Sequence, residues 1–333
     1  MQVACAGVCN TDLACHTAKI PTQRPIVLGH EGAGIVLEIA SDVASVAVGD
    51  RVVMSFMSCG TCSSCLKGTV AYCRHNFQIN MLGGGLDGTR CYVGSEIRSH
   101  FFGQSSFATL AVSSERNVVR VPDQMTLPVA APFGCGILTG AGTVLNSLRV
   151  RPGQSVAVFG AGAVGMSAAM VAAIAGASPI VMVDMVESRL DLALSLGVDI
   201  AINAADPGVV DEIERHTRGG ADYCIEASGS PTALGQAIDA IGPAGVCACV
   251  GGTRGAVPFD PQALRIKGGT IRGVVEGDAD PRLLLPYLFK EFERGRLPVD
   301  RFMETYAFTD IGRAFEDAAA GLIVKPVLSM NGD

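Results

Sequence analysis

Apolar positions change their spacing along the chain near residue 138. Beyond it, short apolar runs alternate with segments whose apolar residues recur at helical intervals. Strand and helix in alternation are typical of a parallel, doubly wound sheet, the Rossmann type of α/β fold. The pattern predicts strands at residues 155–159, 180–183, 221–225, 246–250 and 270–274, and helices at 164–175 and 189–196.

The first third of the chain has a different pattern. Short apolar runs at residues 34–39 and 51–54 are separated by glycines, cysteines and turn-forming residues. This spacing favours a small β domain with irregular loops. Near the other end of the chain, Asp280 and Pro281 predict the start of a helix over 282–293, and a last helix is expected at 310–320.

One segment resembles a membrane span in composition. Residues 155–183 include no charged side chain, and such a length could cross a bilayer. Four glycines and a proline interrupt it, and a buried strand–helix–strand of a parallel sheet is also apolar throughout. We therefore interpret the segment as the core of the doubly wound sheet.

Composition and charge narrow the class of protein. The 333 residues are 49% hydrophobic and 17% charged, which suits two packed domains and excludes a disordered chain. The net charge of −7, without a cluster of lysines and arginines, argues against nucleic-acid binding. No signal-peptide pattern precedes the 12 cysteines, so we expect a reducing, cytoplasmic compartment.

A dinucleotide-binding pattern follows the first predicted strand of the sheet. Gly160, Gly162 and Gly165 enclose Ala161, Ala163 and Val164 in a GxGxxG sequence. The glycines allow a tight turn, close approach of a pyrophosphate and close packing of the next helix. Asp184 ends the next strand about twenty residues later, where a carboxylate bonds the ribose hydroxyls and disfavours a 2′-phosphate. The pattern therefore predicts NAD rather than NADP.

Four cysteines lie close together in the first third. Cys59, Cys62, Cys65 and Cys73 have a spacing that lets one loop wrap a tetrahedral ion. Zinc with four thiolates has no open position, so this site should be structural. A [4Fe–4S] cluster also takes four thiolates, and it stays an alternative at this point.

A second metal site needs residues from distant segments. Cys9, His30 and Cys135 each have an ordinary interpretation, because buried cysteines and core histidines are common. Together they make a Cys₂His set, which leaves a fourth zinc position open for water or substrate. Spacing alone does not decide whether these three residues share a metal or are ordinary buried residues.

The motifs occur in an order that resembles the zinc-dependent alcohol dehydrogenases of the medium-chain dehydrogenase/reductase superfamily. These motifs are GVCNTD, GHEGAGIV, VGDRVV, the CxxCxxC loop, GCGILTGAG and GAGAVG. Residues 101–112, FFGQSSFATLAV, most resemble the aryl- or benzyl-alcohol branch. The resemblance implies a GroES-like, β-rich catalytic domain at 1–137, with the zinc loop at 59–73, an NAD-binding Rossmann domain at 138–277, and a return to the catalytic domain at 278–333.

The resemblance also implies roles for single residues. Cys9, His30 and Cys135 would hold a catalytic zinc, and the four-cysteine loop would hold a structural zinc, two ions per chain. Thr11 would take the substrate proton, Asp12 would hydrogen-bond His30, and Glu31 would lie behind the metal. The expected coenzyme contacts, beyond residues 160–165 and Asp184, are Thr139, Arg189, Val250 and Lys325, and Phe56 is expected in the wall of the substrate pocket.

The implied activity is reversible oxidation of primary aromatic or allylic alcohols to aldehydes, with hydride transfer to NAD⁺. A glutathione-dependent formaldehyde dehydrogenase and a general alcohol dehydrogenase are alternatives. A truncated, inactive protein that binds NAD or zinc is an alternative of another class. A homodimer or homotetramer is also implied by the resemblance.

Two departures from the family pattern carry further expectations. Asn10 stands where the family usually has histidine or arginine, so we expect weaker NAD binding or faster NADH release, and Asn10→His should change the coenzyme affinity. Met1 falls inside a strand that the family precedes with a hairpin, so an N-terminal hairpin is expected to be missing and the β domain to expose apolar surface. Six cysteines have no role by resemblance: Cys5, Cys15, Cys91, Cys224, Cys247 and Cys249.

Overall fold

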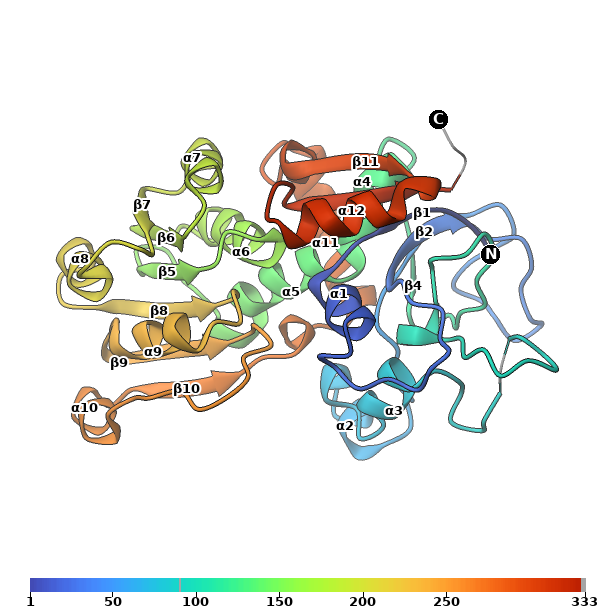
Figure 1. Ribbon diagram of the computed structural model, residues 1–333, viewed down its shortest axis with the longest axis horizontal. Helices are drawn as coiled ribbons and strands as arrows, with labels where there is room; N and C mark the ends of the chain where they lie inside the picture. The colour runs from blue at the N-terminus through green and yellow to red at the C-terminus, as the bar shows by residue number, and fades with distance from the viewer. Residues whose placement is uncertain (90, 331–333) are drawn as a thin grey trace. The chain divides into compact units, whose positions relative to one another are not determined.

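The computed structural model describes residues 1–89 and 91–330, which form two compact units (Figure 1). The β-rich unit comprises Met1–Leu138, Ala279–Gly295 and the described residues from Val299 onward. The α/β unit comprises Thr139–Asp278 and Arg296–Pro298. The divisions thus fall after residues 138 and 278, where the sequence led us to expect 137 and 277.

The α/β unit is built on a parallel sheet in the strand order β10-β9-β8-β5-β6-β7. The order reverses between β5 and β8, which is where doubly wound sheets bind their ligands. The strands are β5 (Val156–Phe159), β6 (Ile180–Asp184), β7 (Ile200–Asn203), β8 (Ala221–Glu226), β9 (Ile241–Cys249) and β10 (Thr270–Gly273).

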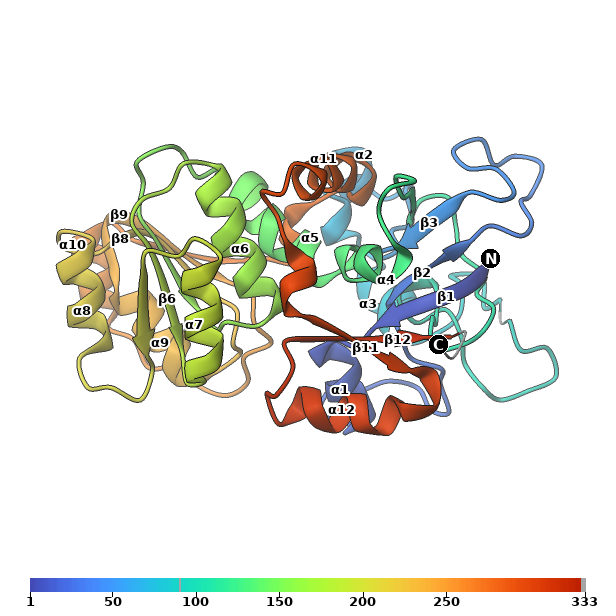
Figure 2. The same ribbon diagram turned by 90° about the horizontal axis from the view of Figure 1, so that it is seen from above.

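Helices cover both faces of this sheet (Figure 2). Right-handed crossovers place α6 and α7 on one face and α8, α9 and α10 on the other. The uncharged segment 155–183 forms β5, α6 and β6, and its strands and most of its helix are buried. The helices are α6 (Ala163–Ile174), α7 (Glu187–Ser195), α8 (Val209–His216), α9 (Pro231–Asp239) and α10 (Pro261–Lys267).

Two strands of this sheet differ from the sequence expectation. Strand β9 begins at Ile241, five residues before the predicted start, because Ile241 already pairs with Ala221 of β8, and a bulge separates it from the regular pairing that resumes at Val246. Gly242, Pro243 and Gly245 between these positions are turn-forming residues, which hid the strand in the sequence. Strand β7 is only four residues long and half-buried, so its apolar pattern was too short to predict it.

The β-rich unit contains a six-stranded sheet in the order β11-β12-β1-β2-β3-β4. Strand β12, from the end of the chain, pairs with both β1 and β11. Residues near Lys325 therefore lie beside residues near Gly7. The strands are β1 (Gln2–Gly7), β2 (Glu31–Ile35), β3 (Arg51–Met54), β4 (Val118–Arg120), β11 (Met303–Ala307) and β12 (Lys325–Ser329).

Short helices connect and cover this second sheet. The apolar run at 34–39 is strand only as far as Ile35, and Leu37 and Ile39 beyond it are exposed. The helices are α1 (Asn10–His16), α2 (Ser63–Leu66), η1 (Val70–Tyr72), α3 (Asn76–Met81), η2 (Phe101–Gly103), α4 (Leu127–Ala130), η3 (Ala131–Gly134), α5 (Gly136–Gly142), the π-helical η4 (Thr143–Leu148), η5 (Glu276–Asp278), α11 (Pro281–Glu293), η6 (Val299–Phe302), η7 (Phe308–Asp310) and α12 (Ile311–Ala319). The division between the two units falls within α5.

The described residues include no single helix that is long and apolar enough to cross a membrane. One pair, Leu127–Gly134 with Gly136–Leu148, passes that test together by length and composition, and it is bent by 55°.

Candidate metal centre and coenzyme site

The first candidate ligand lies at the start of α1. Cys9 is the N-terminal cap of this helix, and its backbone N–H donates to Asp12 Oδ2 at 3.1 Å. This bond satisfies one of the backbone donors that a helix start leaves unpaired. The cap therefore fixes Cys9 relative to Thr11 and Asp12, which occupy the first turn.

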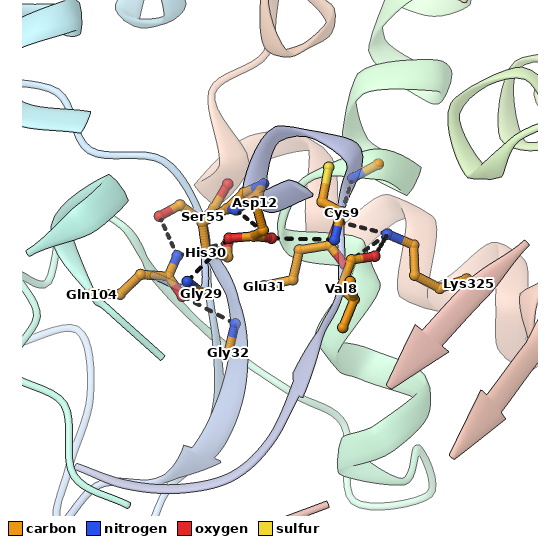
Figure 3. A network of polar contacts seen from close by, with 11 residues as sticks. Val8, Cys9, Asp12, Gly29, His30, Glu31, Gly32, Ser55, Gln104 and Lys325 are labelled. Atoms are coloured by element: carbon orange, nitrogen blue, oxygen red, sulfur yellow. Dashed lines mark hydrogen bonds and ion pairs between the residues drawn. The ribbon is translucent and has the colours of Figure 1, made fainter. Parts of the chain in front are cut away.

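Asp12 also joins α1 to the second candidate ligand (Figure 3). Its Oδ1 accepts the Gly29 backbone N–H at 3.0 Å, and its Oδ2 lies 3.0 Å from His30 Nδ1. Asp12 and His30 are both fully buried. With Nδ1 turned toward Asp12, the other ring nitrogen is left to face the neighbouring thiols, as in metal-binding histidines.

The third candidate ligand belongs to another segment of the β-rich unit. Cys135 follows η3, and its Sγ lies within 4.8 Å of the ligand atoms of Cys9, His30 and Glu31. His30 Nε2 is buried and has no hydrogen-bond partner in the described part of the chain. A hydrogen bond from Cys135, together with the nearby His30, holds the pKa of Cys9 well below its ordinary value despite burial. Two sulfurs and an imidazole so placed fit zinc with one position open.

A buried ion pair lies directly beside this set. Lys325 Nζ donates to both carboxylate oxygens of Glu31 at 2.9 Å and to the Val8 carbonyl at 3.1 Å. Burial lowers the pKa of Lys325, but the Glu31 carboxylate raises it above its usual value. Lys325 is among the residues that the sequence led us to expect at the coenzyme, and in the structure its ammonium group is paired with Glu31.

Gln104, which sequence reasoning did not single out, supports the His30 segment. Its Nε2 donates to the His30 carbonyl at 2.8 Å and to the Ser55 carbonyl at 3.1 Å. Its Oε1 accepts the Gly32 N–H at 3.0 Å, so one buried amide ties the segment of His30 and Gly32 to Ser55 (Figure 3). Gln104 lies within the 101–112 motif, and that motif is the sequence feature that could have indicated it.

Aromatic rings pack on His30. Phe102 stacks on His30 with ring centroids 4.4 Å apart, and Phe101 meets it edge-on at 5.7 Å. Phe56, expected in the pocket wall, is also buried, at 2% exposure. The Phe101 and Phe102 rings thus give the His30 ring apolar neighbours, in addition to the charged Asp12 at its Nδ1.

The four cysteines of the loop bring their Sγ atoms close together. The Sγ atom of Cys62 lies 3.5 Å from that of Cys65 and 4.0 Å from that of Cys73. The Sγ atoms of Cys59 and Cys65 are 3.9 Å apart. A tetrahedral zinc with Zn–S bonds of about 2.3 Å requires sulfurs about 3.8 Å apart, so the loop fits this ion.

Backbone amides stabilise negative charge on these sulfurs. The N–H groups of Arg74 and His75 donate to Cys62 and Cys73, and the N–H of Cys59 also donates to Cys73. The Arg74 N–H contributes most to lowering the pKa of the Cys62 thiol, to about 6. Four thiolate donors leave no open position, which is the property of a structural site.

The glycine-rich turn lies at the carboxyl end of β5. Gly160 has a φ of +104°, and a side chain on Gly165 would collide with the Gly160 carbonyl. Gly162 caps α6 and faces open space, with no atom within 4 Å of the position of a Cβ. With Ala163 and Val164 beginning the helix, the turn offers backbone N–H groups and the helix N-terminus to a phosphate group.

Asp184 lies beside this turn at the end of β6. Its carboxylate accepts the Ala161 N–H at 2.6 Å and the Val186 N–H at 2.9 Å. Arg189, in α7, is half-buried, and its Nε is without a hydrogen-bond partner among the described residues. These two side chains lie where the first half of a dinucleotide is expected.

The remaining predicted coenzyme residues also belong to the α/β unit. Thr139 is buried, and its Oγ1 donates to Glu276 Oε2 at 3.2 Å just beyond β10. The N–H of Val250, which follows β9, donates to the Glu226 carbonyl at 2.9 Å. Glu226 and Glu276 were not predicted as site residues. Their positions at or just beyond the carboxyl ends of strands could have indicated them.

Comparisons with known proteins agree with this arrangement. Residues 1–123 match the alcohol dehydrogenase GroES-like domain, and residues 163–290 match the zinc-binding dehydrogenase family. The chain is 40% identical to geraniol dehydrogenase of Castellaniella defragrans, over 98% of this chain and 89% of that protein.

Two crystal structures are similar over 98% of this chain and 90% of each structure, with TM-scores of 0.95. One is an alcohol dehydrogenase zinc-binding domain protein from Burkholderia ambifaria, at 46% identity. The other is benzyl alcohol dehydrogenase from Acinetobacter calcoaceticus, at 41% identity. Zinc, rather than the iron–sulfur cluster that the thiol spacing left open, is the metal of this family. The chain belongs to the zinc-binding alcohol dehydrogenases of the medium-chain dehydrogenase/reductase superfamily.

Proposed function

We propose that this protein oxidises primary aromatic or allylic alcohols to aldehydes, reversibly, with NAD⁺ as the hydride acceptor. The observation that carries the proposal is the stacking of Phe102 on His30, beside a Cys₂His set that fits zinc. An aromatic wall next to the metal favours a flat, conjugated alcohol through offset and edge-to-face contacts.

The residues of the metal centre have distinct roles in this proposal. Cys9, His30 and Cys135 would hold the catalytic ion, and Cys59, Cys62, Cys65 and Cys73 would hold a second, structural ion. When bound, zinc lowers the pKa of the substrate hydroxyl and NAD⁺ accepts the hydride. Thr11 Oγ1 would accept the hydroxyl proton while it releases its own proton outward, and Asp12 would keep His30 in the tautomer that presents Nε2.

The polarity of the aromatic segment supports a neutral substrate. Residues 101–107 include three phenylalanines and no charged side chain. A pocket of this kind offers no counter-charge to an anionic glutathione adduct. The names of the relatives, geraniol dehydrogenase and benzyl alcohol dehydrogenase, describe an allylic and an aromatic alcohol.

The open turn at Gly162 and the carboxylate of Asp184 support NAD as the coenzyme. Asp184 would accept bonds from the adenosine ribose and repel a 2′-phosphate. Arg189 would cover the adenosine, and Thr139 and Val250 would contact the nicotinamide. We further propose a homodimer or homotetramer in the cytoplasm, in keeping with the family resemblance.

The test follows NADH absorbance with zinc-loaded protein. Benzyl alcohol and geraniol should give kcat/KM values at least about tenfold above ethanol. S-(hydroxymethyl)glutathione should be a poor substrate, and NADP⁺ a poor acceptor. Equal rates with ethanol, or preference for the glutathione adduct, would contradict the proposal. No turnover with two zinc ions bound would instead support the inactive alternative.

A pair of variants tests the aromatic wall. Phe102→Ala should lower kcat/KM for benzyl alcohol by about tenfold and change ethanol oxidation less. Phe77→Ala is the matched control, because Phe77 is 52% exposed and lies in α3. An equal loss for both alcohols in Phe102→Ala would show that the ring supports the metal site and does not select the substrate.

A further inference from the structure

A cysteine–histidine pair of the β-rich unit includes no candidate metal ligand. Cys91 Sγ is 3.1 Å from Nε2 of His100. Cys91 is the exposed cysteine among the described residues, while the others are buried or half-buried. Its N–H donates to Ser99 Oγ at 3.0 Å, which holds the thiol beside the ring. Neither metal site uses either residue.

The pair has the arrangement of an activated thiol. Burial lowers the pKa of His100, and nearby Asp87 only partly opposes this effect. The imidazole is therefore neutral near pH 7 and is able to accept the thiol proton. A cysteine with a base in hydrogen-bond reach reacts as the thiolate, which is the nucleophilic form.

A cavity opens beside the thiol. It has a volume of about 790 Å³, and Cys91 forms part of its lining. The apolar residues of the same lining include Val36, Leu37, Ile39, Leu110, Val112 and Val118. His100 itself lines a neighbouring cavity of about 470 Å³.

We propose that Cys91 is a covalent addition site for α,β-unsaturated aldehydes, with His100 as its base. The choice of this electrophile rests on the proposed function, whose products include such aldehydes. The thiolate forms a bond to the β-carbon, and the C=C π electrons move to give an enolate. The enolate α-carbon then takes back, through His100, the proton that the thiol gave up. The reaction needs no oxidant or reductant.

The experiment adds cinnamaldehyde directly to zinc-loaded protein without coenzyme. Intact mass should show the gain of one aldehyde, and peptide mapping after borohydride reduction should place it on Cys91. Because no turnover is needed, labelling tests this site even if the chain oxidises no alcohol. Labelling of other cysteines in preference to Cys91 would overturn the proposal. This comparison needs only the wild-type protein.

Matched controls separate addition from general reactivity. 3-Phenylpropanal, which lacks the C=C bond, should leave the Cys91 peptide unmodified. Cys91→Ser should lose the adduct, and His100→Gln should slow its formation on the order of 10²-fold, as loss of a general base does. His216→Gln, in α8, should react like the wild type. Thermal unfolding checks that each variant is folded, and a wild-type rate in folded His100→Gln would contradict the role of the base.

Discussion

Asp12 Oδ2 lies 3.0 Å from Nδ1 of His30, and neither side chain is exposed. The same carboxylate accepts the backbone N–H groups of Cys9 and Gly29. One side chain therefore ties together two candidate zinc ligands, Cys9 and His30, that are 21 positions apart in the sequence. The zinc site and the start of α1 depend on this carboxylate together.

Replacing Asp12 should weaken the catalytic zinc more than it weakens the fold. Asp12→Asn keeps the size of the side chain but loses the charge behind His30, so zinc affinity should fall about 10- to 100-fold. Competition with a chromophoric chelator measures the affinity. Asp42→Asn, at an exposed loop position, is the control. Unchanged affinity in Asp12→Asn would mean that the contact with His30 does not tune the metal.

The two zinc sites should respond independently to loss of a thiolate. Cys135→Ser should keep one zinc per chain, lose turnover and change thermal stability little. Cys62→Ser should also keep one zinc, but it should lower the unfolding temperature more, because the closed site holds its loop together. Metal content and calorimetry on the same samples decide the matter. Loss of both ions from either variant would contradict two separate sites.

The ion pair behind the metal should be essential to stability. Lys325→Met leaves the Glu31 carboxylate buried without its cation, which should cost about 3–5 kcal/mol of unfolding free energy. Adding Glu31→Gln should recover part of that loss. Lys267→Met is the control, since its partly exposed pair with Glu214, at 3.7 Å, should contribute about 1 kcal/mol or less. Urea unfolding of the four proteins gives the comparison, and equal losses for the two lysines would refute it.

Asp184 should determine the choice between the two coenzymes. Asp184→Ala removes the charge that disfavours a 2′-phosphate, so the ratio of kcat/KM for NAD⁺ to that for NADP⁺ should fall by about tenfold or more, equivalent to about 1.4 kcal/mol. Asp191→Ala, exposed in α7, should leave the ratio unchanged. If Asp184→Ala leaves this ratio unchanged, Asp184 does not contact the adenosine ribose, which would contradict the prediction.

Features whose partners are close in sequence were predictable from the chain alone. The glycine turn at residues 160–165, the strand that ends at Asp184 and the four-cysteine loop depend on spacings of a few residues to about twenty-five. Local periodicity also predicted α6, α7, α11 and α12 to within about three residues, since each buries one face or is buried throughout. The motif order identified the family, which the comparisons confirm.

Tertiary structure decided which distant side chains meet. Cys9, His30 and Cys135 converge because β2 pairs with β1 and η3 returns to the same sheet. Lys325 and Glu31 are 294 positions apart in sequence, and they pair because β12 lies beside β1. The contacts of Phe102 with His30 and of Cys91 with His100 likewise depend on how the loops that carry them fold. No period or spacing encodes such contacts, because packing and strand order bring these side chains together only when the whole unit folds.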